Sequence, residues 1–148
     1  MPLERIIKEK TSADHLLYVS MKYTKTCDVI QNLLQRWTSM IDVSIDALLE
    51  KIKKKKIITA IPVAPKMKID TLKDAFKKNP EILQTLELYE FFRKVPQLET
   101  KRESDFRKNV CLTVLYQGKE IRIDLEKLDE YNQTLERFIK FVREFLSI

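Results

Sequence analysis

The fold is decided by residues 12–54, which read SADHLLYVSMKYTKTCDVIQNLLQRWTSMIDVSIDALLEKIKK and contain neither glycine nor proline. Apolar side chains recur in this stretch at steps of three or four residues, which is the spacing of one face of an α-helix. They are Leu16, Val19, Tyr23, Cys27, Ile30, Leu34, Trp37, Ile41, Ile45, Leu48 and Ile52. A second apolar row runs beside the first, so the face needs neighbours on more than one side. The pattern predicts one long helix that begins near Thr11 or Ser12 and ends near Lys54.

An unbroken helix of this length would measure about 60 Å at 1.5 Å per residue. A compact domain of this size is only about 40 Å across. Either the helix breaks, for example where Thr38 and Ser39 can bond back to the preceding turn, or it overhangs the domain and a second subunit covers it. We favour the overhang and therefore predict a homodimer.

The rest of the chain predicts shorter elements around this helix. Residues 57–68 contain two prolines, which disfavour helix before them, and we expect an extended connection there. A short helix is expected to begin at Asp70 or Thr71. The next helix is expected to be capped by Asn79, to have Pro80 at its first position and to stop before Pro96.

One segment has the alternation of a β-hairpin. Residues 98–108 are polar and predict a loop or a helical turn, whereas apolar and other residues alternate from Val110 to Tyr116. A two-residue turn at Gln117-Gly118 gives a consistent register, pairing Val114 with Ile121 and Leu112 with Ile123. Asp124 is expected to cap a last helix. The fold class is therefore mainly α, a helical bundle with a long first helix plus one β-hairpin at about 110–124.

Composition limits the function. The chain has 148 residues, of which 44% are hydrophobic and 34% charged, which is typical of a single globular domain spanning 1–148. No apolar run approaches the ~18 residues of a membrane span, so we expect a cytoplasmic protein without a membrane partner.

Because Gly118 is the only glycine, a dinucleotide fingerprint and a phosphate-binding P-loop are excluded. Cys27, Cys111 and His15 do not form a zinc motif, so we expect no metal and no cofactor. Richness in Lys, Glu and Ile is typical of a thermophile.

Positive charge is concentrated in residues 51–78, where ten lysines face two aspartates and give a net charge of +8 against +6 for the whole chain. Clusters of this kind bind nucleic-acid phosphates. The candidate residues are Lys51, Lys53, Lys54, Lys55, Lys56, Lys66 and Lys68. The alternative is that the lysines stabilise a helix C-terminus and keep the surface soluble. Lysine in place of arginine and the lack of interleaved aromatic residues favour this alternative.

A second polar cluster precedes the predicted hairpin. Arg102 and Arg107 could hold a phosphate with Glu103 or Asp105 as a base, and His15 is a further candidate for acid–base work. The alternative is a solvated loop with local ion pairs, each contributing ~0–1 kcal/mol. We favour the solvated loop.

Residues 14–26, DHLLYVSMKYTKT, resemble the opening of uncharacterised archaeal helical-bundle proteins. The layout of a long first helix, paired later helices and an arginine-bearing stretch is similar to HEPN domains. This resemblance implies a bundle that dimerises and acts on nucleotides or RNA. Active HEPN members carry an arginine followed a few residues later by a histidine, whereas here Arg102 and Arg107 are followed by Asn109 and no histidine. The departure argues against ribonuclease activity.

These observations leave the biochemical function open between three classes. We favour a non-catalytic binding or assembly module that forms a homodimer. The first alternative is a nucleic-acid-binding protein that uses residues 51–68. The second is a HEPN-like ribonuclease or nucleotide-handling enzyme that uses Arg102 and Arg107.

Overall fold

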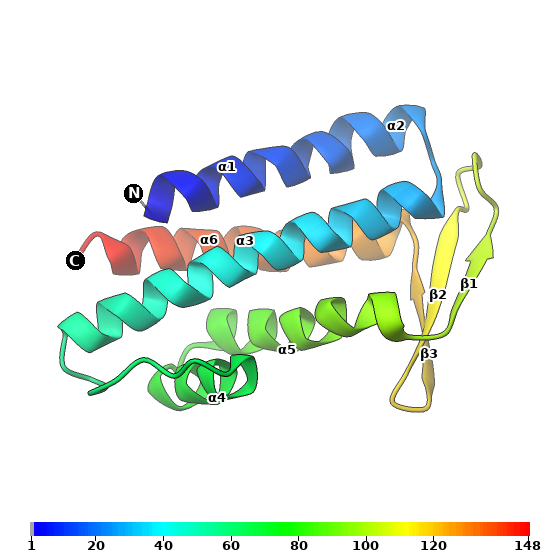
Figure 1. Ribbon diagram of the computed structural model, residues 1–148. Coiled ribbons are helices and arrows are strands. Elements are labelled where there is room, and N and C mark those ends of the chain that lie inside the picture. Colours follow the sequence, from blue (N-terminus) through cyan, green and yellow to red (C-terminus); the bar gives the residue numbers. More distant parts are fainter. Residues whose placement is uncertain (1) are drawn as a thin grey trace.

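The computed structural model describes residues 2–148 and is mainly α-helical, with a small antiparallel sheet at one end of a helical bundle (Figure 1). The helices are α1 (Pro2–His15), α2 (Met21–Tyr23), α3 (Cys27–Lys54), α4 (Pro65–Ala75), α5 (Pro80–Lys94) and α6 (Leu125–Leu146). A π-helical turn, η1 (Leu16–Ser20), joins α1 to α2, and a 3₁₀ turn, η2 (Val95–Gln97), follows α5. The strands are β1 (Thr100–Glu103), β2 (Cys111–Tyr116) and β3 (Lys119–Ile123). Among the described residues, no helix is both long and apolar enough to cross a membrane.

The prediction of one continuous helix from Ser12 to Lys54 is wrong. Helical structure begins at Pro2, is interrupted after Tyr23, and resumes at Cys27 as α3, which runs back beside α1 (Figure 1). Thr26 is the N-cap of α3, with an extended backbone (φ −123°, ψ 156°) and a side chain that accepts a 3.3 Å hydrogen bond from the N–H of Val29. β-branched threonine is a weak helix former and a good N-cap. The break therefore has a local cause without glycine or proline.

The helix does not break where the sequence suggested it could. Thr38 lies within α3, and its hydroxyl donates a 2.8 Å hydrogen bond to the carbonyl oxygen of Leu34 in the preceding turn. This back-bonding leaves the helix intact, because the main-chain hydrogen bonds of α3 continue through it. α3 ends at Lys54, as predicted.

The broad apolar face of α3 is covered within the chain. Trp37, at its centre, has no exposed surface; its ring stacks on Phe92 of α5 at 5.9 Å and meets Tyr131 of α6 edge-on at 6.4 Å. α1 packs along another side of α3. The reason for predicting a second subunit therefore does not apply. Two members of the predicted apolar stripe lie outside the core, since Val19 is 40% and Tyr23 77% exposed.

The predicted hairpin is confirmed, including its register. β2 pairs with β3 so that Val114 lies opposite Ile121 and Leu112 opposite Ile123. The turn residues Gln117 and Gly118 both have positive φ, 53° and 77°, as a two-residue hairpin turn requires.

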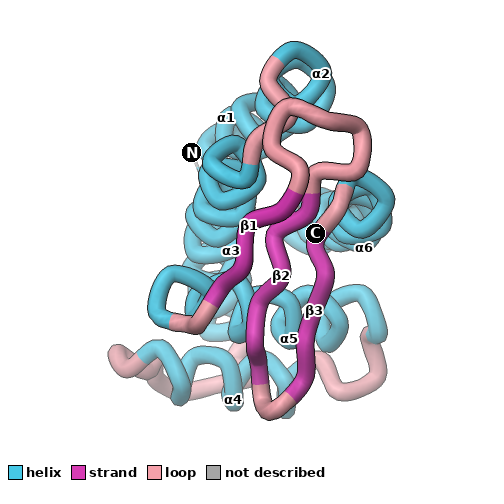
Figure 2. The backbone as a smooth tube through the Cα atoms, turned by 90° about the vertical axis from the view of Figure 1, so that its right-hand side faces the viewer, coloured by secondary structure: helices cyan, strands magenta, loops and turns pink. Residues whose placement is uncertain are grey.

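Residues 98–108 contain a third strand that the sequence analysis missed. β1 pairs antiparallel with β2, with Thr100 opposite Val114 and Glu103 opposite Cys111. Its sequence, TKRE, lacks apolar alternation because it is an edge strand whose side chains are exposed or half-buried. Figure 2 shows the three strands in the order β1-β2-β3.

The remaining helices complete the bundle. α4 begins at Pro65, earlier than the predicted start at Asp70 or Thr71, because Pro65 fits the first turn of a helix. α5 begins at Pro80 and ends before Pro96, as predicted, although the side chain of its N-cap Asn79 makes no capping hydrogen bond. The carboxylate of Asp124 caps α6 by accepting a 2.8 Å hydrogen bond from the N–H of Lys127.

Candidate functional site

The four residues considered for catalysis do not form a common site. Arg102, on β1, makes an ion pair with Asp28 on α3, and this hydrogen bond raises the pKa of the guanidinium. Glu103 lies 3.5 Å from Lys101 and 3.6 Å from Arg122.

The other two candidates lie apart from this pair. Arg107 is exposed in the β1–β2 loop, and His15 is exposed at the end of α1. Asp28 and Glu103 are thus engaged by cations and Asp105 accepts the N–H of Cys27, so these carboxylates are poorly placed to act as a base toward a bound phosphate.

The seven candidate lysines divide into two groups. Three of them are either paired with another group of the chain or lie on a different helix. Lys51 donates to the carbonyl oxygen of Ile148, Lys68 pairs with Asp46 at 2.8 Å, and Lys66 lies in the first turn of α4. The other four, which we call the lysine end, are Lys53, Lys54, Lys55 and Lys56.

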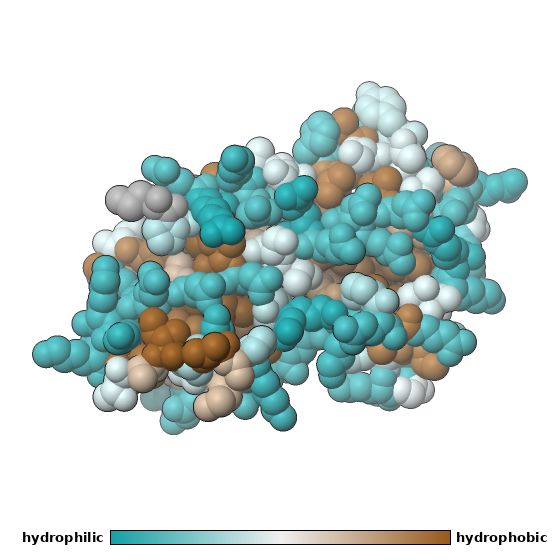
Figure 3. Space-filling model, viewed as in Figure 1, coloured by the Kyte–Doolittle hydropathy of each residue, from teal (hydrophilic) through white to brown (hydrophobic). Residues whose placement is uncertain are grey.

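The lysine end is exposed and lacks carboxylate partners among residues 2–148. Lys53 and Lys54 belong to the last turn of α3, whereas Lys55 and Lys56 lie beyond it. Lys55 is placed over the ring of Phe145 at 5.8 Å, and Lys56 has a left-handed backbone with φ 63°. The connection between α3 and α4 exposes apolar side chains, including Ile57 and Val63. Figure 3 shows an apolar patch over this connection on a face that is otherwise mainly hydrophilic.

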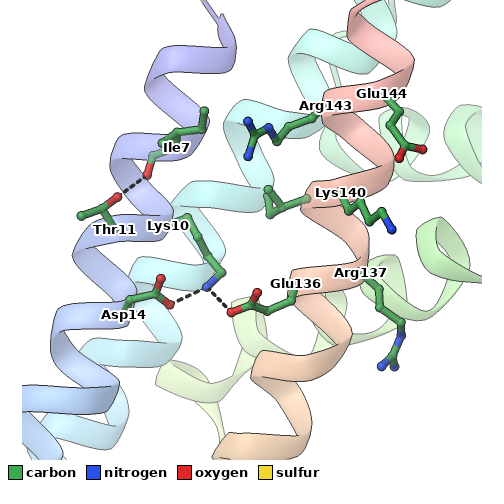
Figure 4. A pocket seen from close by; sticks show the side chains of 10 residues that line it. Ile7, Lys10, Thr11, Asp14, Glu136, Arg137, Lys140, Arg143 and Glu144 are labelled. Carbon is green, nitrogen blue, oxygen red and sulfur yellow. Dashed lines mark hydrogen bonds and ion pairs between the residues drawn. The ribbon is translucent and has the colours of Figure 1, made fainter.

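A groove of about 680 Å³ separates α1 from α6. Figure 4 shows Lys10 reaching from α1 to Glu136 of α6, at 3.1 Å, with Asp14 as its second carboxylate partner. Arg143 extends toward α1, whereas Arg137 and Lys140 turn away (Figure 4). Because Lys10 is nearly buried and is held by two carboxylates, the ammonium group is a structural charge and is not free to bind an anion.

The polar network behind this groove was not found from the sequence. Asn132 is buried and donates hydrogen bonds to the hydroxyl of Tyr18 at 2.9 Å and to Glu136 at 3.4 Å. Tyr18 and Asn132 lie 114 positions apart, and each occupies an ordinary helical position. No sequence signal could therefore have joined them.

A second groove, of about 530 Å³, lies between α4 and α5. Lys66 lines it with Arg93 and Lys94. Lys73, on the same wall, is paired with Glu90 at 2.7 Å, and this hydrogen bond raises the pKa of Lys73. Lys66 therefore belongs to a different surface from the lysine end.

The cysteines and acidic residues do not offer reactive chemistry. Cys27 and Cys111 are buried free thiols; the thiol of Cys27 donates to the carbonyl oxygen of Cys111 at 3.3 Å, and burial raises the pKa of Cys27. A raised pKa keeps the thiol protonated and a weak nucleophile. Within residues 2–148, no group of three or more His, Cys, Asp or Glu side chains is placed to hold a metal ion.

The chain matches no family model, no curated protein and no solved structure. The resemblance to HEPN domains therefore stays a prediction. Function is inferred from the arrangement of this chain's own residues.

Proposed function

We propose that this protein is a non-catalytic module that binds nucleic acid through the lysine end. The proposal depends on one observation: Lys53, Lys54 and Lys56 are exposed and have no carboxylate partner among residues 2–148. Unpaired lysines attract phosphate groups, and binding releases the counterions condensed on a nucleic acid.

Stabilisation of the helix end accounts for only part of this cluster. Lys53 and Lys54 lie in the last turn of α3, where a positive charge favours the helix dipole. Lys56 lies beyond the helix as its left-handed cap residue, and its N–H donates to the carbonyl oxygen of Lys53 at 2.9 Å; this cap needs the backbone conformation and not the ammonium charge. The charge density at this end therefore exceeds what helix capping requires.

A binding role also agrees with the finding that the residues considered for catalysis do not lie together in one site. Arg102 and Glu103 are engaged in ion pairs, and His15 lies on α1. The predicted homodimer is not part of this proposal, because α1, α5 and α6 supply the cover that a second subunit was expected to give.

Electrophoretic mobility shifts with labelled RNA and DNA test the proposal between about 50 mM and about 200 mM salt. The wild-type protein is expected to bind at the low salt concentration and to release as salt rises. A Lys53→Gln, Lys54→Gln, Lys56→Gln variant should bind about tenfold more weakly, with a salt slope smaller by about two to three.

The matched control removes three exposed lysines elsewhere, as Lys77→Gln, Lys78→Gln and Lys119→Gln. Both variants have the same net charge, so a general charge effect would weaken them equally. Equal binding by the two variants, or no binding by the wild type at about 50 mM salt, would contradict the proposal.

A further inference from the structure

Two aromatic side chains are exposed together at the end of the molecule opposite the lysine end. Tyr23, the last residue of α2, is 77% exposed, and Phe106, in the β1–β2 loop, is 76% exposed. Figure 2 shows this loop rising beside α2. Such exposure is unusual for large rings, because each would contribute more to stability if it were buried.

Hydrogen bonds between distant segments hold the two rings at one junction. The N–H of Phe106 donates to the carbonyl oxygen of Lys25 at 2.5 Å. The N–H of Cys27 donates to the carboxylate of Asp105 at 2.9 Å, across 78 residues of sequence. The β1–β2 loop is thus fastened to the connection between α2 and α3, which begins directly after Tyr23.

Two residues of the β1–β2 loop have an unfavourable backbone conformation. Phe106 has φ 69° and Ser104 has φ 59°, both in the left-handed region. A bulky residue without glycine's freedom adopts this region only at a cost. The ring of Phe106 is in solvent, so packing of that ring does not offset the cost. Strain of this kind is typical of binding sites.

Free positive charge surrounds the two rings. Lys22 lies 5.8 Å from the ring centroid of Tyr23, and Arg107 and Lys108 follow Phe106 directly. Lys22, Arg107 and Lys108 have no carboxylate partner among the residues described. We call Tyr23, Phe106, Lys22, Arg107 and Lys108 the aromatic tip.

Two of the three carboxylates near the aromatic tip are paired with cations. Asp28 is paired with Arg102, Glu103 lies 3.6 Å from Arg122, and Asp105 accepts the N–H of Cys27. Asp105 keeps its charge, because a neutral N–H does not cancel it, so three unpaired cations face one unpaired carboxylate at this end.

We infer that the aromatic tip is a stacking platform for single-stranded nucleic acid. The aromatic rings can stack on unpaired bases, while the neighbouring cations contact the phosphates. Bases inside a duplex are already stacked and cannot reach the rings. The inference rests on the proposed function and adds the class of nucleic acid and a second site.

The charge of this surface favours nucleic acid over a protein partner. The centres of protein–protein interfaces are depleted of lysine, whereas grooves for single strands combine cations with aromatic rings. Here Tyr23 and Phe106 are flanked by three unpaired cations and by one carboxylate without a cationic partner, Asp105.

Fluorescence anisotropy with the full chain tests this inference. The probes are fluorescein-labelled oligo(dT) and oligo(U) of about 15 nucleotides and a duplex of the same length. A Tyr23→Leu, Phe106→Leu variant should bind the single strands about tenfold more weakly and the duplex within about twofold of the wild type. A Tyr23→Trp, Phe106→Trp variant should retain single-strand binding, because it keeps aromatic faces.

The matched control is a Val63→Ala, Met67→Ala variant, which removes exposed apolar side chains away from the tip and should bind like the wild type. Thermal unfolding checks that every variant is folded. Unchanged single-strand affinity in the double-leucine variant, or an equal loss for duplex, would overturn the inference. If that variant is unaffected while the lysine-end variant loses binding, the proposed function stands and only the aromatic tip is rejected.

Discussion

The main-chain N–H of Cys27 and the carboxylate of Asp105 are joined by a 2.9 Å hydrogen bond. Cys27 is the first residue of α3, and Asp105 lies in the β1–β2 loop. The bond satisfies one of the free N–H groups at the start of the helix and places a negative charge at the positive end of its dipole. A loop far along the chain thus completes the cap that Thr26 begins.

Removing this cap should destabilise the protein. Asp105→Ala is expected to lower the free energy of unfolding by about 1 kcal/mol, which is typical for loss of a helix cap. Urea unfolding followed by circular dichroism measures the change. Asp129→Ala, an exposed aspartate on α6, is the matched control. Equal unfolding midpoints for the two variants would show that the Asp105 bond does not stabilise α3.

Trp37 offers a test of how α3 is packed. The side chain is fully buried between Phe92 and Tyr131, and its indole N–H has no hydrogen-bond partner among the described residues. Trp37→Ala should therefore cost about 3–5 kcal/mol of stability. Trp37→Phe should cost much less, about 1.5 kcal/mol or below, since it keeps a ring and removes an unsatisfied donor. Similar losses in the two variants would contradict this packing.

Stability should fall at high pH because of buried tyrosines. Burial raises the pKa of Tyr131 from its ordinary value of 10.0 to about 12. Burial and a hydrogen bond with Asp42 raise the pKa of Tyr89 as well. Between pH 10 and pH 12 the unfolded chain loses the Tyr131 proton and the folded chain keeps it. The free energy of unfolding therefore decreases as pH rises, by up to about 1.4 kcal/mol per pH unit for each such group.

Urea unfolding at about pH 9 and about pH 11 measures this dependence. Tyr131→Phe should show a smaller decrease than the wild type, because phenylalanine has no proton to lose. Tyr23→Phe, at an exposed position, is the matched control and should resemble the wild type. An identical decrease in Tyr131→Phe would mean that Tyr131 ionises equally in both states.

The cover that α3 receives within the chain leads us to predict a monomer. Because α1, α5 and α6 pack around α3, we expect sedimentation at micromolar concentration to give a mass near 17.6 kDa. A mass of twice this value would restore the dimer that the sequence predicted and would require an interface other than the buried face of α3.

The pattern of apolar residues predicted most helices and the hairpin, but it could not locate the helix break. Tyr23 and Cys27 are four residues apart, so the helical spacing continues through residues 24–26. The signal that marks the break is the threonine pair around Lys25, with Asp28 in the first turn of α3. Periodicity shows which side of a helix is apolar. It does not show that the chain turns back between two helices when the apolar residues keep the same spacing across the turn.

The candidate site was predictable only in part. The exposed lysine end lies where the charge distribution placed it, while Lys51, Lys66 and Lys68 have other contacts or lie on another surface. Phe106 stands alone in a polar stretch, so the sequence gives no reason to expect it at a binding site. The helical spacing of Tyr23 predicts that its side chain is buried in the core. Their proximity depends on a hydrogen bond between the β1–β2 loop and residue 25, which sequence spacing cannot reveal.

Amide chemical shifts recorded while a single-stranded oligonucleotide is added to the labelled protein would test nucleic-acid binding most directly, because they report contact residue by residue. We expect the largest shifts at residues 22–25, at residues 104–108 and at the lysine end, and we expect them to decrease as salt is raised. An absence of shifts at low salt, or shifts confined to the groove between α1 and α6, would contradict this expectation.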